Sequence, residues 1–131
     1  RSPKVEQLSF NDSCSILFYD NKRKIQLRAK CKAFINNKNK ISKVHWDKTP
    51  LQSRKCYMGD FKPSQILKEW HPNFPLKYLK CDPEKLDSES GYENFTIVKL
   101  IVKKIDVLEL HHDGHIRFTM NSLKKINYIA P

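Results

Sequence analysis

The sequence predicts a mainly β protein, an antiparallel β-barrel with inserted helices. From Lys24 to Ala33, cationic or amide side chains alternate with apolar ones, as in a half-buried strand. Residues 95–110 form a second strand-like run that is rich in Ile and Val. Asp113-Gly114 lies between two strand-like runs, which is typical of a β-hairpin. Closing such a sheet into a small barrel would remove its unpaired edges.

Length and charge limit the classes of function. The chain has 131 residues, enough for one domain with a real core, and we predict a single domain over residues 1–131. Its 25 Lys and Arg residues outnumber 14 Asp and Glu residues, giving a net charge of +11. That charge favours polyanionic or phosphorylated partners, but it also fits an ordinary lysine-rich surface. The cations are spread along the whole chain without an arginine-rich tail or zinc module, which argues against nucleic-acid binding.

The first part of the chain reads as a helix followed by a hairpin. Ser2 is a suitable N-cap for a helix over residues 2–8, and Pro3 suits its first helical position. Residues 15–19 form a short strand, and residues 20–23 have the composition of a turn. The alternating strand that follows, over residues 24–34, is then the second arm of a hairpin.

The middle of the chain has a weaker pattern. Residues 41–46 predict a short amphipathic helix that ends before Pro50. Residues 51–91 are rich in Pro, Ser and charge, and we interpret them as an excursion with helices over 63–70 and 83–86. A segment this long without strong pattern is typical of a functional loop or lid. Strands over 115–120 and 126–129 complete the sheet.

The cysteines and histidines do not form a metal-binding pattern. Cys14, Cys31, Cys56 and Cys81 are widely separated and include no C-x-x-C motif, so we predict no metal site. Cys31 falls on the apolar strand face and reads as a buried thiol. This cysteine usage indicates a reducing compartment, and we predict a cytoplasmic protein. No apolar run approaches the length of a membrane span, so no membrane association is predicted.

Two positions suggest ligand chemistry from residue type alone. Ser2 and Lys4 lie at a helix N-terminus, where free N–H groups, a hydroxyl and a cation suit a phosphate. The alternative is an ordinary helix cap beside a solvated lysine. Gln26 interrupts the cationic strand face, and its amide both donates and accepts, so it can bind the edge of a heteroaromatic ring. The alternative is a solvent-facing polar residue.

Several phrases in a fixed order resemble the pyridoxamine 5'-phosphate oxidase family, closest to a bacterial-type branch of its flavin-binding proteins. The phrases are RSPKVEQL, SILFYD, KIQLR, WDKTPLQSRKCY, ENFTIV and GHIRF. The resemblance implies an FMN-binding split barrel that forms a homodimer with FMN at the interface. It covers nearly the whole chain and implies that the chain corresponds to the C-terminal two-thirds of the family domain, without the first strands.

The resemblance also assigns cofactor-binding residues. Lys4 and Ser2 would contact the FMN phosphate, and Arg1 would substitute for a family arginine where this chain has Pro3. Gln26 would hydrogen-bond the isoalloxazine edge, and Arg117 matches an arginine that contacts the flavin. At the position of a flavin-stacking tryptophan this chain departs from the family and has Val107.

The substrate side matches the family less well. Of the residues implied to contact substrate, Ser53 and His115 are retained. Two phosphate-binding arginines and a tyrosine are replaced, by Asp113, Thr49 and His45. Losing both arginines removes several charge-assisted hydrogen bonds to a substrate phosphate. The resemblance therefore supports FMN binding more strongly than it supports oxidation of pyridoxamine phosphate.

The function we expect is an FMN-dependent oxidoreductase that acts on a small-molecule substrate, with no catalytic residue assigned. The cofactor would carry the hydride or electron chemistry while the protein positions it. The open alternatives are an FMN-dependent reductase of another substrate and a non-catalytic flavin- or haem-binding module. A small barrel that binds nucleic acid through its basic strand face is a more distant alternative.

Overall fold

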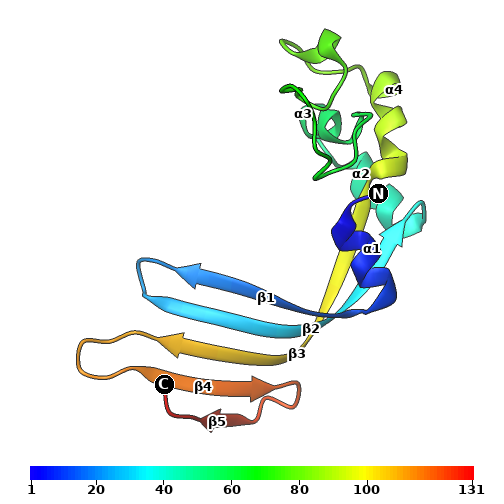
Figure 1. The fold of residues 1–131 in the computed structure, drawn as a ribbon. Helices are drawn as coiled ribbons and strands as arrows, with labels where there is room; N and C mark the ends of the chain where they lie inside the picture. The colour runs from blue at the N-terminus through cyan, green and yellow to red at the C-terminus, as the bar shows by residue number, and fades with distance from the viewer. The chain divides into compact units, whose positions relative to one another are not determined.

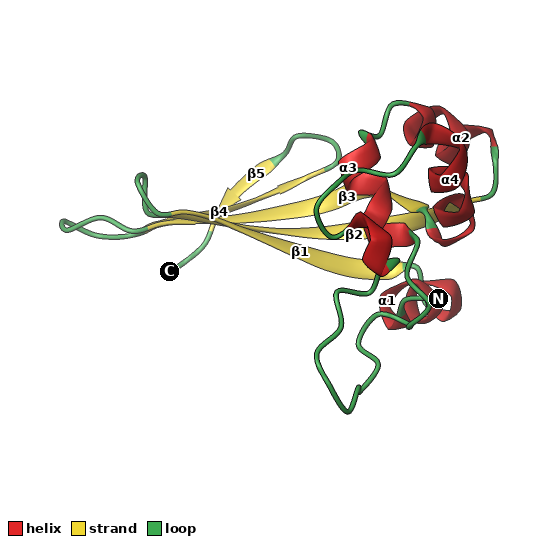
Figure 2. Cartoon of the chain, turned by 90° about the horizontal axis from the view of Figure 1, so that it is seen from above, coloured by secondary structure: helices red, strands yellow, loops and turns green.

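The computed structural model describes residues 1–131, which form two compact units. The helical unit comprises Arg1–Phe10 and Ile35–Lys99, and the sheet unit comprises Asn11–Phe34 and Leu100–Pro131. Figure 1 shows the path of the chain, and Figure 2 shows where its helices and strands lie. No helix has both the length and the apolar character needed to cross a membrane.

The sheet has five strands in the order β1-β2-β3-β4-β5, so every strand lies beside its neighbour in sequence. The strands are β1 (Ser13–Asp20), β2 (Ile25–Asn37), β3 (Thr96–Glu109), β4 (Ile116–Asn121) and β5 (Ile126–Tyr128). The β1/β2, β3/β4 and β4/β5 pairs are antiparallel. The Leu110 N–H donates to the Lys24 carbonyl, which joins the end of β3 to the start of β2 and makes that pair antiparallel as well.

The alternation predicted for the second strand is confirmed. Along β2 the side chains of Ala29, Cys31 and Ala33 are buried, while Lys30 and Lys32 between them are exposed. Lys24 belongs to the preceding turn, where its φ of 56° is left-handed. Asp20 closes that turn because its carboxylate accepts hydrogen bonds from the N–H groups of Lys22 and Arg23.

The predicted hairpin at Asp113-Gly114 is also confirmed. It connects β3 to β4, and Gly114 has a φ of 123°, a conformation that side-chain-bearing residues rarely adopt. The barrel expected from the sequence is not seen in closed form. The strand order runs from β1 to β5 without a pairing between these two strands, so the sheet is open. The fold is therefore mainly β with an open antiparallel sheet and inserted helices.

The helical unit contains α1 (Pro3–Phe10), α2 (Lys40–Asp47), α3 (Leu51–Arg54) and α4 (Lys85–Ser88). It also contains the 3₁₀ helices η1 (Lys55–Tyr57), η2 (Leu76–Tyr78) and η3 (Glu89–Asn94). A reciprocal capping box starts α2: the Ser42 N–H donates to the Asn39 side chain, and the Asn39 N–H donates to the Ser42 hydroxyl. This box fixes the start of the helix that the sequence predicts over 41–46.

An aromatic cluster forms the core of the helical unit. Trp46 of α2 is completely buried, and its ring centroid lies 5.9 Å from Tyr57, 5.8 Å from Tyr92 and 5.2 Å from Phe95. Ring pairs at these separations add stability beyond the apolar area that they bury. Gly91 lies so close to this cluster that an added Cβ would sit 3.2 Å from the Trp46 ring. Parts of residues 51–91 therefore contribute to a packed core.

The helix predicted over residues 63–70 is wrong. The segment has no regular structure, and Ser64 has a left-handed φ of 67° immediately after Pro63. The side chains of Ile66 and Trp70 are 95% and 82% exposed. A short helix needs burial of its apolar face to be stable, and no surface covers these residues. The helix predicted over 83–86 is confirmed as α4, shifted by two residues.

Candidate cofactor site

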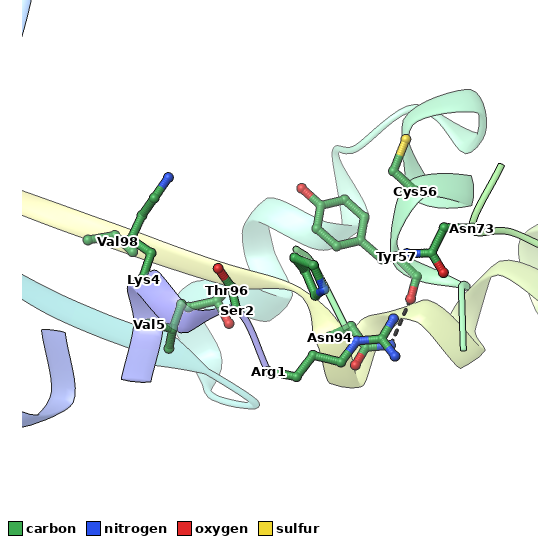
Figure 3. Close-up of a pocket in the computed structure, with 11 residues that line it drawn as sticks. Arg1, Ser2, Lys4, Val5, Cys56, Tyr57, Asn73, Asn94, Thr96 and Val98 are labelled. Atoms are coloured by element: carbon green, nitrogen blue, oxygen red, sulfur yellow. Dashed lines mark hydrogen bonds between the residues drawn. The ribbon is translucent and has the colours of Figure 1, made fainter. Parts of the chain in front are cut away.

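A cleft of about 330 Å³ lies in the helical unit beside the start of α1 (Figure 3). Its walls come from α1, from η1, from the loop that follows η1 and from the junction of η3 with β3. Its polar and aromatic lining includes Arg1, Ser2, Lys4, Tyr57, Asn94 and Thr96. None of the residues lining this cleft is a carboxylate or a histidine, and two of them are cations.

The start of α1 leaves donors free in this cleft. The Ser2 carbonyl accepts hydrogen bonds from the N–H groups of Val5 and Glu6, which places Ser2 at the N-cap. Pro3 has no N–H, so Lys4 supplies the remaining free backbone donor of the first turn. The exposed Lys4 ammonium forms no ion pair or hydrogen bond. A free N–H, a hydroxyl and an unpaired cation therefore lie at the positive end of a helix.

The junction of η3 and β3 supplies the opposite wall. The Thr96 hydroxyl accepts a 3.3 Å hydrogen bond from the Asn37 amide, so its own O–H remains available as a donor. The Asn94 amide donates to the Tyr57 carbonyl at 2.8 Å, the dashed line in Figure 3, which ties η3 to η1. The Tyr57 ring packs against Phe95 at 5.1 Å, so this wall rests on the aromatic core. Asn94 and Thr96 belong to the phrase ENFTIV, but no sequence pattern marked either of them as a cofactor-site residue.

Arg1 closes one side of the cleft by binding backbone. Its guanidinium donates to the carbonyls of Gly59 and Asp60. Gly59 is required there because a Cβ at this position would lie 1.9 Å from the Asn73 carbonyl oxygen. Asn73 in turn pairs through its side chain with both the N–H and the carbonyl of Phe61. Arg1 therefore fastens the loop after η1 to the start of α1.

The second group of sequence-predicted residues lies in the sheet unit. Gln26, on β2, is half-buried opposite Tyr19, and its side-chain amide forms no hydrogen bond. Arg117, on β4, donates to both carboxylate oxygens of Asp106 on β3, from Nε at 3.1 Å and from Nη2 at 2.9 Å. Arg28 of β2 approaches the same carboxylate at 3.3 Å. Two arginines thus share one acid across three adjacent strands.

The hydrogen bonds between Arg117 and Asp106 favour the charged form of both side chains. Hydrogen bonds from Arg117 lower the pKa of Asp106 below its usual value; burial opposes this shift, and the charges of Arg117, Arg28 and Lys104 add to it. The same hydrogen bonds raise the pKa of Arg117. The network lines a hollow of about 450 Å³ in the sheet unit, together with Lys30 and Lys104. The hollow therefore keeps a net positive charge, and the Nη1 nitrogen of Arg117 remains unpaired.

Replacing Asp106 by Asn is expected to lower the free energy of unfolding at pH 7 by about 1–2 kcal/mol, because charge-assisted hydrogen bonds to both arginines are lost. Because folding lowers its pKa, Asp106 stabilises the native state above an unfolded pKa of about 3.9 and loses this effect as pH falls through the folded pKa. Wild type should therefore lose more stability between pH 5 and pH 2, about the range in which such a carboxylate protonates, than Asp106→Asn does. Urea unfolding across this range measures the difference.

The matched control is Asp113→Asn, whose carboxylate is 96% exposed in the β3–β4 turn. This variant should follow the wild-type pH curve, because exposed ion pairs contribute little to stability. Parallel loss of stability in wild type and Asp106→Asn would contradict the assignment of Asp106 as a stabilising carboxylate.

The two residues predicted to contact substrate lie at exposed positions. Ser53 is on α3, and its side chain does not line the cleft. His115 follows the β3–β4 turn, where its Nδ1 accepts a 3.3 Å hydrogen bond from the His111 N–H. Of the sequence-predicted site residues, the structure therefore brings Arg1, Ser2 and Lys4 together in one cleft. Gln26, Arg117 and His115 belong to the sheet unit.

Arg54 belongs to the phrase SRKCY, whose two cations are typical of a solvent-exposed loop. The structure instead buries Arg54 to 2% exposure, with its guanidinium 4.6 Å from the centre of the Trp46 ring. Cys56 is exposed at the cleft and has no histidine among the residues around it. Arg54 is thus a structural residue of the helical unit.

The comparisons with known proteins concern the fold. No family model matches the sequence, and no curated protein matches it either. Among solved structures, the chain is similar to a pyridoxamine 5'-phosphate oxidase-related, FMN-binding protein from Nostoc punctiforme PCC 73102. The TM-score is 0.67 at 15% sequence identity, over 98% of this chain and 68% of that one. The chain therefore has the fold of a pyridoxamine 5'-phosphate oxidase-related protein.

Proposed function

We propose that the protein is an FMN-dependent oxidoreductase, with one domain that acts as a homodimer and binds FMN at the dimer interface. The observation that carries the proposal is the cleft at the start of α1, where the unpaired Lys4 lies with the hydroxyls of Ser2 and Thr96. The fold similarity to an FMN-binding protein supports it. The free cysteines are consistent with a reducing cytoplasm as the place of action.

The donor set of the cleft fits a phosphate monoester. A phosphate dianion needs several donors and a positive potential, and here Lys4 supplies an ammonium and a free backbone N–H. The hydroxyls of Ser2 and Thr96 add neutral donors, and no carboxylate lines the cleft to repel the anion. Arg1 would act indirectly, because its guanidinium holds the carbonyls of Gly59 and Asp60.

The proposal assigns Gln26 and Arg117 to the flavin ring system, on the strength of the family resemblance. Gln26 has an amide without a hydrogen-bond partner, and Arg117 has an unpaired Nη1 although Asp106 holds its other nitrogens. Bound FMN would supply hydride or electron transfer, and the protein would position it. Ser53 and His115 are the proposed contacts to a small-molecule substrate.

The basic face of β2 argues less for nucleic acid than its sequence suggests. Arg28 pairs with Asp106, and Lys32 pairs with Asp12 at 3.1 Å, so two of its cations already have acidic partners. Polyanion binding depends on cations that are free to replace the counterions of the nucleic acid. A single-stranded nucleic-acid ligand is therefore a weaker candidate than FMN.

Titrating the purified full-length protein with FMN tests the proposal. Wild type should quench flavin fluorescence with saturable binding and should melt at a higher temperature with FMN. Gln26→Ala should weaken FMN binding or shift the redox potential of the bound flavin, because the amide contact to the ring is lost. Lys32→Ala, on the same strand face but outside the hollow that Arg117 lines, should change neither quantity. A protein that leaves flavin fluorescence and melting temperature unchanged would sink the proposal.

If FMN binds, stopped-flow reduction separates the candidate reactions. Rapid flavin bleaching by pyridoxamine phosphate would identify an oxidase, and bleaching by NAD(P)H would identify a reductase. Stoichiometric FMN that no donor reduces would instead identify a non-catalytic flavin-binding module. Titration with haem, followed by absorption, tests whether the protein binds haem instead of FMN.

A further inference from the structure

Two cysteines that are remote in sequence face each other across β1 and β2. Cys14 and Cys31 are direct partners in the antiparallel register of these strands. Directly opposed side chains emerge on the same face of a sheet, so both thiols lie on one face. Both cysteines are free thiols in this structure.

The register puts the two residues at a separation that a disulfide can bridge. The Ala33 N–H donates to the Asp12 carbonyl at 2.7 Å, which makes Asp12 and Ala33 a hydrogen-bonded pair. Hydrogen-bonded and non-hydrogen-bonded pairs alternate along an antiparallel ladder, so Cys14 and Cys31 form the next hydrogen-bonded pair. Cα atoms in such a pair are about 5.5 Å apart, within the range of about 4.4–6.8 Å found for disulfides. Their Cβ atoms are also about 5.5 Å apart, so they must approach each other by about 1 Å for the bond to close.

Solvent reaches the pair through a hollow in the sheet unit. This hollow has a volume of about 440 Å³, and both Cys14 and Cys31 line it with Lys103 of β3. The side chain of Arg28 pairs with that of Asp106, so both lie on one face of the sheet. Cys31 is three residues from Arg28, and Lys103 is three residues from Asp106. Because side chains alternate along a strand, Cys31 and Lys103 lie on the other face. Lys103 therefore lies on the same face as the two thiols.

The two thiols differ in accessibility. Cys14 is half-buried, whereas Cys31 is 5% exposed and its thiol lies 3.7 Å from the Ala29 carbonyl. Burial raises the pKa of the Cys31 thiol, and the neighbouring Cys14 adds to this shift. Cys14 is thus the thiol that an external reagent meets first, and Cys31 is placed to react with it from the next strand.

We propose that Cys14 and Cys31 form a redox-active dithiol that closes to a disulfide across β1 and β2 by exchange with a small-molecule disulfide. The Cys14 thiolate attacks one sulfur of that molecule and releases the other half as a thiolate, which leaves a mixed disulfide on Cys14. The Cys31 thiol then loses its proton to solvent, attacks the Cys14 sulfur and expels the second thiolate. Overall, two protein thiols are oxidised and one external disulfide is reduced to two thiols.

The test uses the full chain with Cys56→Ser and Cys81→Ser, because both of these thiols are exposed. Oxidised glutathione is the probe, and intact-mass and peptide mass spectrometry are the readouts. The protein should lose the mass of two hydrogens, yield a Cys14–Cys31 cross-linked peptide and return to the dithiol with reduced glutathione. The disulfide should raise the melting temperature by about 5 °C because it restricts the unfolded chain.

Two single variants in the same background check the order of steps. Cys31→Ser should stop at a stable glutathione adduct on Cys14, and Cys14→Ser should react at least tenfold more slowly than Cys31→Ser. A glutathione adduct on Cys14 that persists while Cys31 is present would overturn the proposal, and so would no reaction at either residue. FMN takes no part in these measurements, so their outcome is independent of the proposed oxidoreductase activity.

Discussion

Replacing Arg54 by Met is expected to lower the free energy of unfolding of the helical unit by about 3 kcal/mol, near the lower end of the cost of breaking a buried ion pair. The side chain is 2% exposed, and all three guanidinium nitrogens donate hydrogen bonds. Met retains much of the apolar volume but cannot donate. Urea unfolding followed by Trp fluorescence measures the change, because Trp46 lies against Arg54.

The expected size follows from the groups that Arg54 leaves behind. Nη2 donates to the Trp46 carbonyl at 2.8 Å and Nε donates to the Thr49 carbonyl at 3.1 Å, while Nη1 binds Ser88 and Glu89. Buried acceptors that lose a donor keep the full cost of their desolvation. Glu89 is 36% exposed, so water replaces part of the interaction that it loses. The expected loss in the free energy of unfolding is therefore at the lower end of the range for buried ion pairs.

Two further variants distinguish the effect of burying Arg54 from the effect of its charge on stability. Lys43→Met removes a half-exposed cation from the same Glu89 carboxylate, and it should cost less than about 1 kcal/mol. Arg54→Lys keeps the charge but lacks the planar fork that reaches several acceptors, so it should remain destabilised. Equal unfolding midpoints for Arg54→Met and Lys43→Met would show that Arg54 does not hold the helical unit together.

Replacing Lys4 by Ala is expected to weaken FMN binding by about 10-fold to 100-fold, the equivalent of one charge-assisted hydrogen bond of about 1.5–3 kcal/mol. Lys4 is the unpaired cation of the cleft, and the proposal places the FMN phosphate beside its ammonium. Riboflavin lacks this phosphate, so its affinity should be nearly the same for wild type and Lys4→Ala. Fluorescence titration of both flavins gives the comparison.

The control for net charge is Lys68→Ala, an exposed lysine of the helical unit that does not line the cleft. It should leave the affinities for FMN and for riboflavin unchanged. If Lys4→Ala weakened both flavins equally, Lys4 would not be a phosphate contact. If Lys68→Ala matched Lys4→Ala, a general electrostatic attraction would explain the binding instead.

The strands and their turns could be predicted because their signals are local. Alternation along β2 follows from the period of an extended chain, and the Asp-Gly hairpin follows from the conformational freedom of Gly114. The helix predicted over 63–70 failed because its pattern had no surface to pack against, and Ile66 and Trp70 remain exposed. The predicted barrel is not closed, because its two edge strands, β1 and β5, do not pair with each other.

Local sequence patterns specified the alternating faces of β2, the two hairpin turns, the helix that is seen as α2 and the N-cap of α1. These features depend on residues a few positions apart, so local geometry specifies them. Long-range packing places Arg54 against Trp46, brings Arg117 and Arg28 to the same Asp106 carboxylate and sets Cys14 opposite Cys31. Each of these contacts joins distant segments, and packing and strand register, rather than local propensity, select the partner.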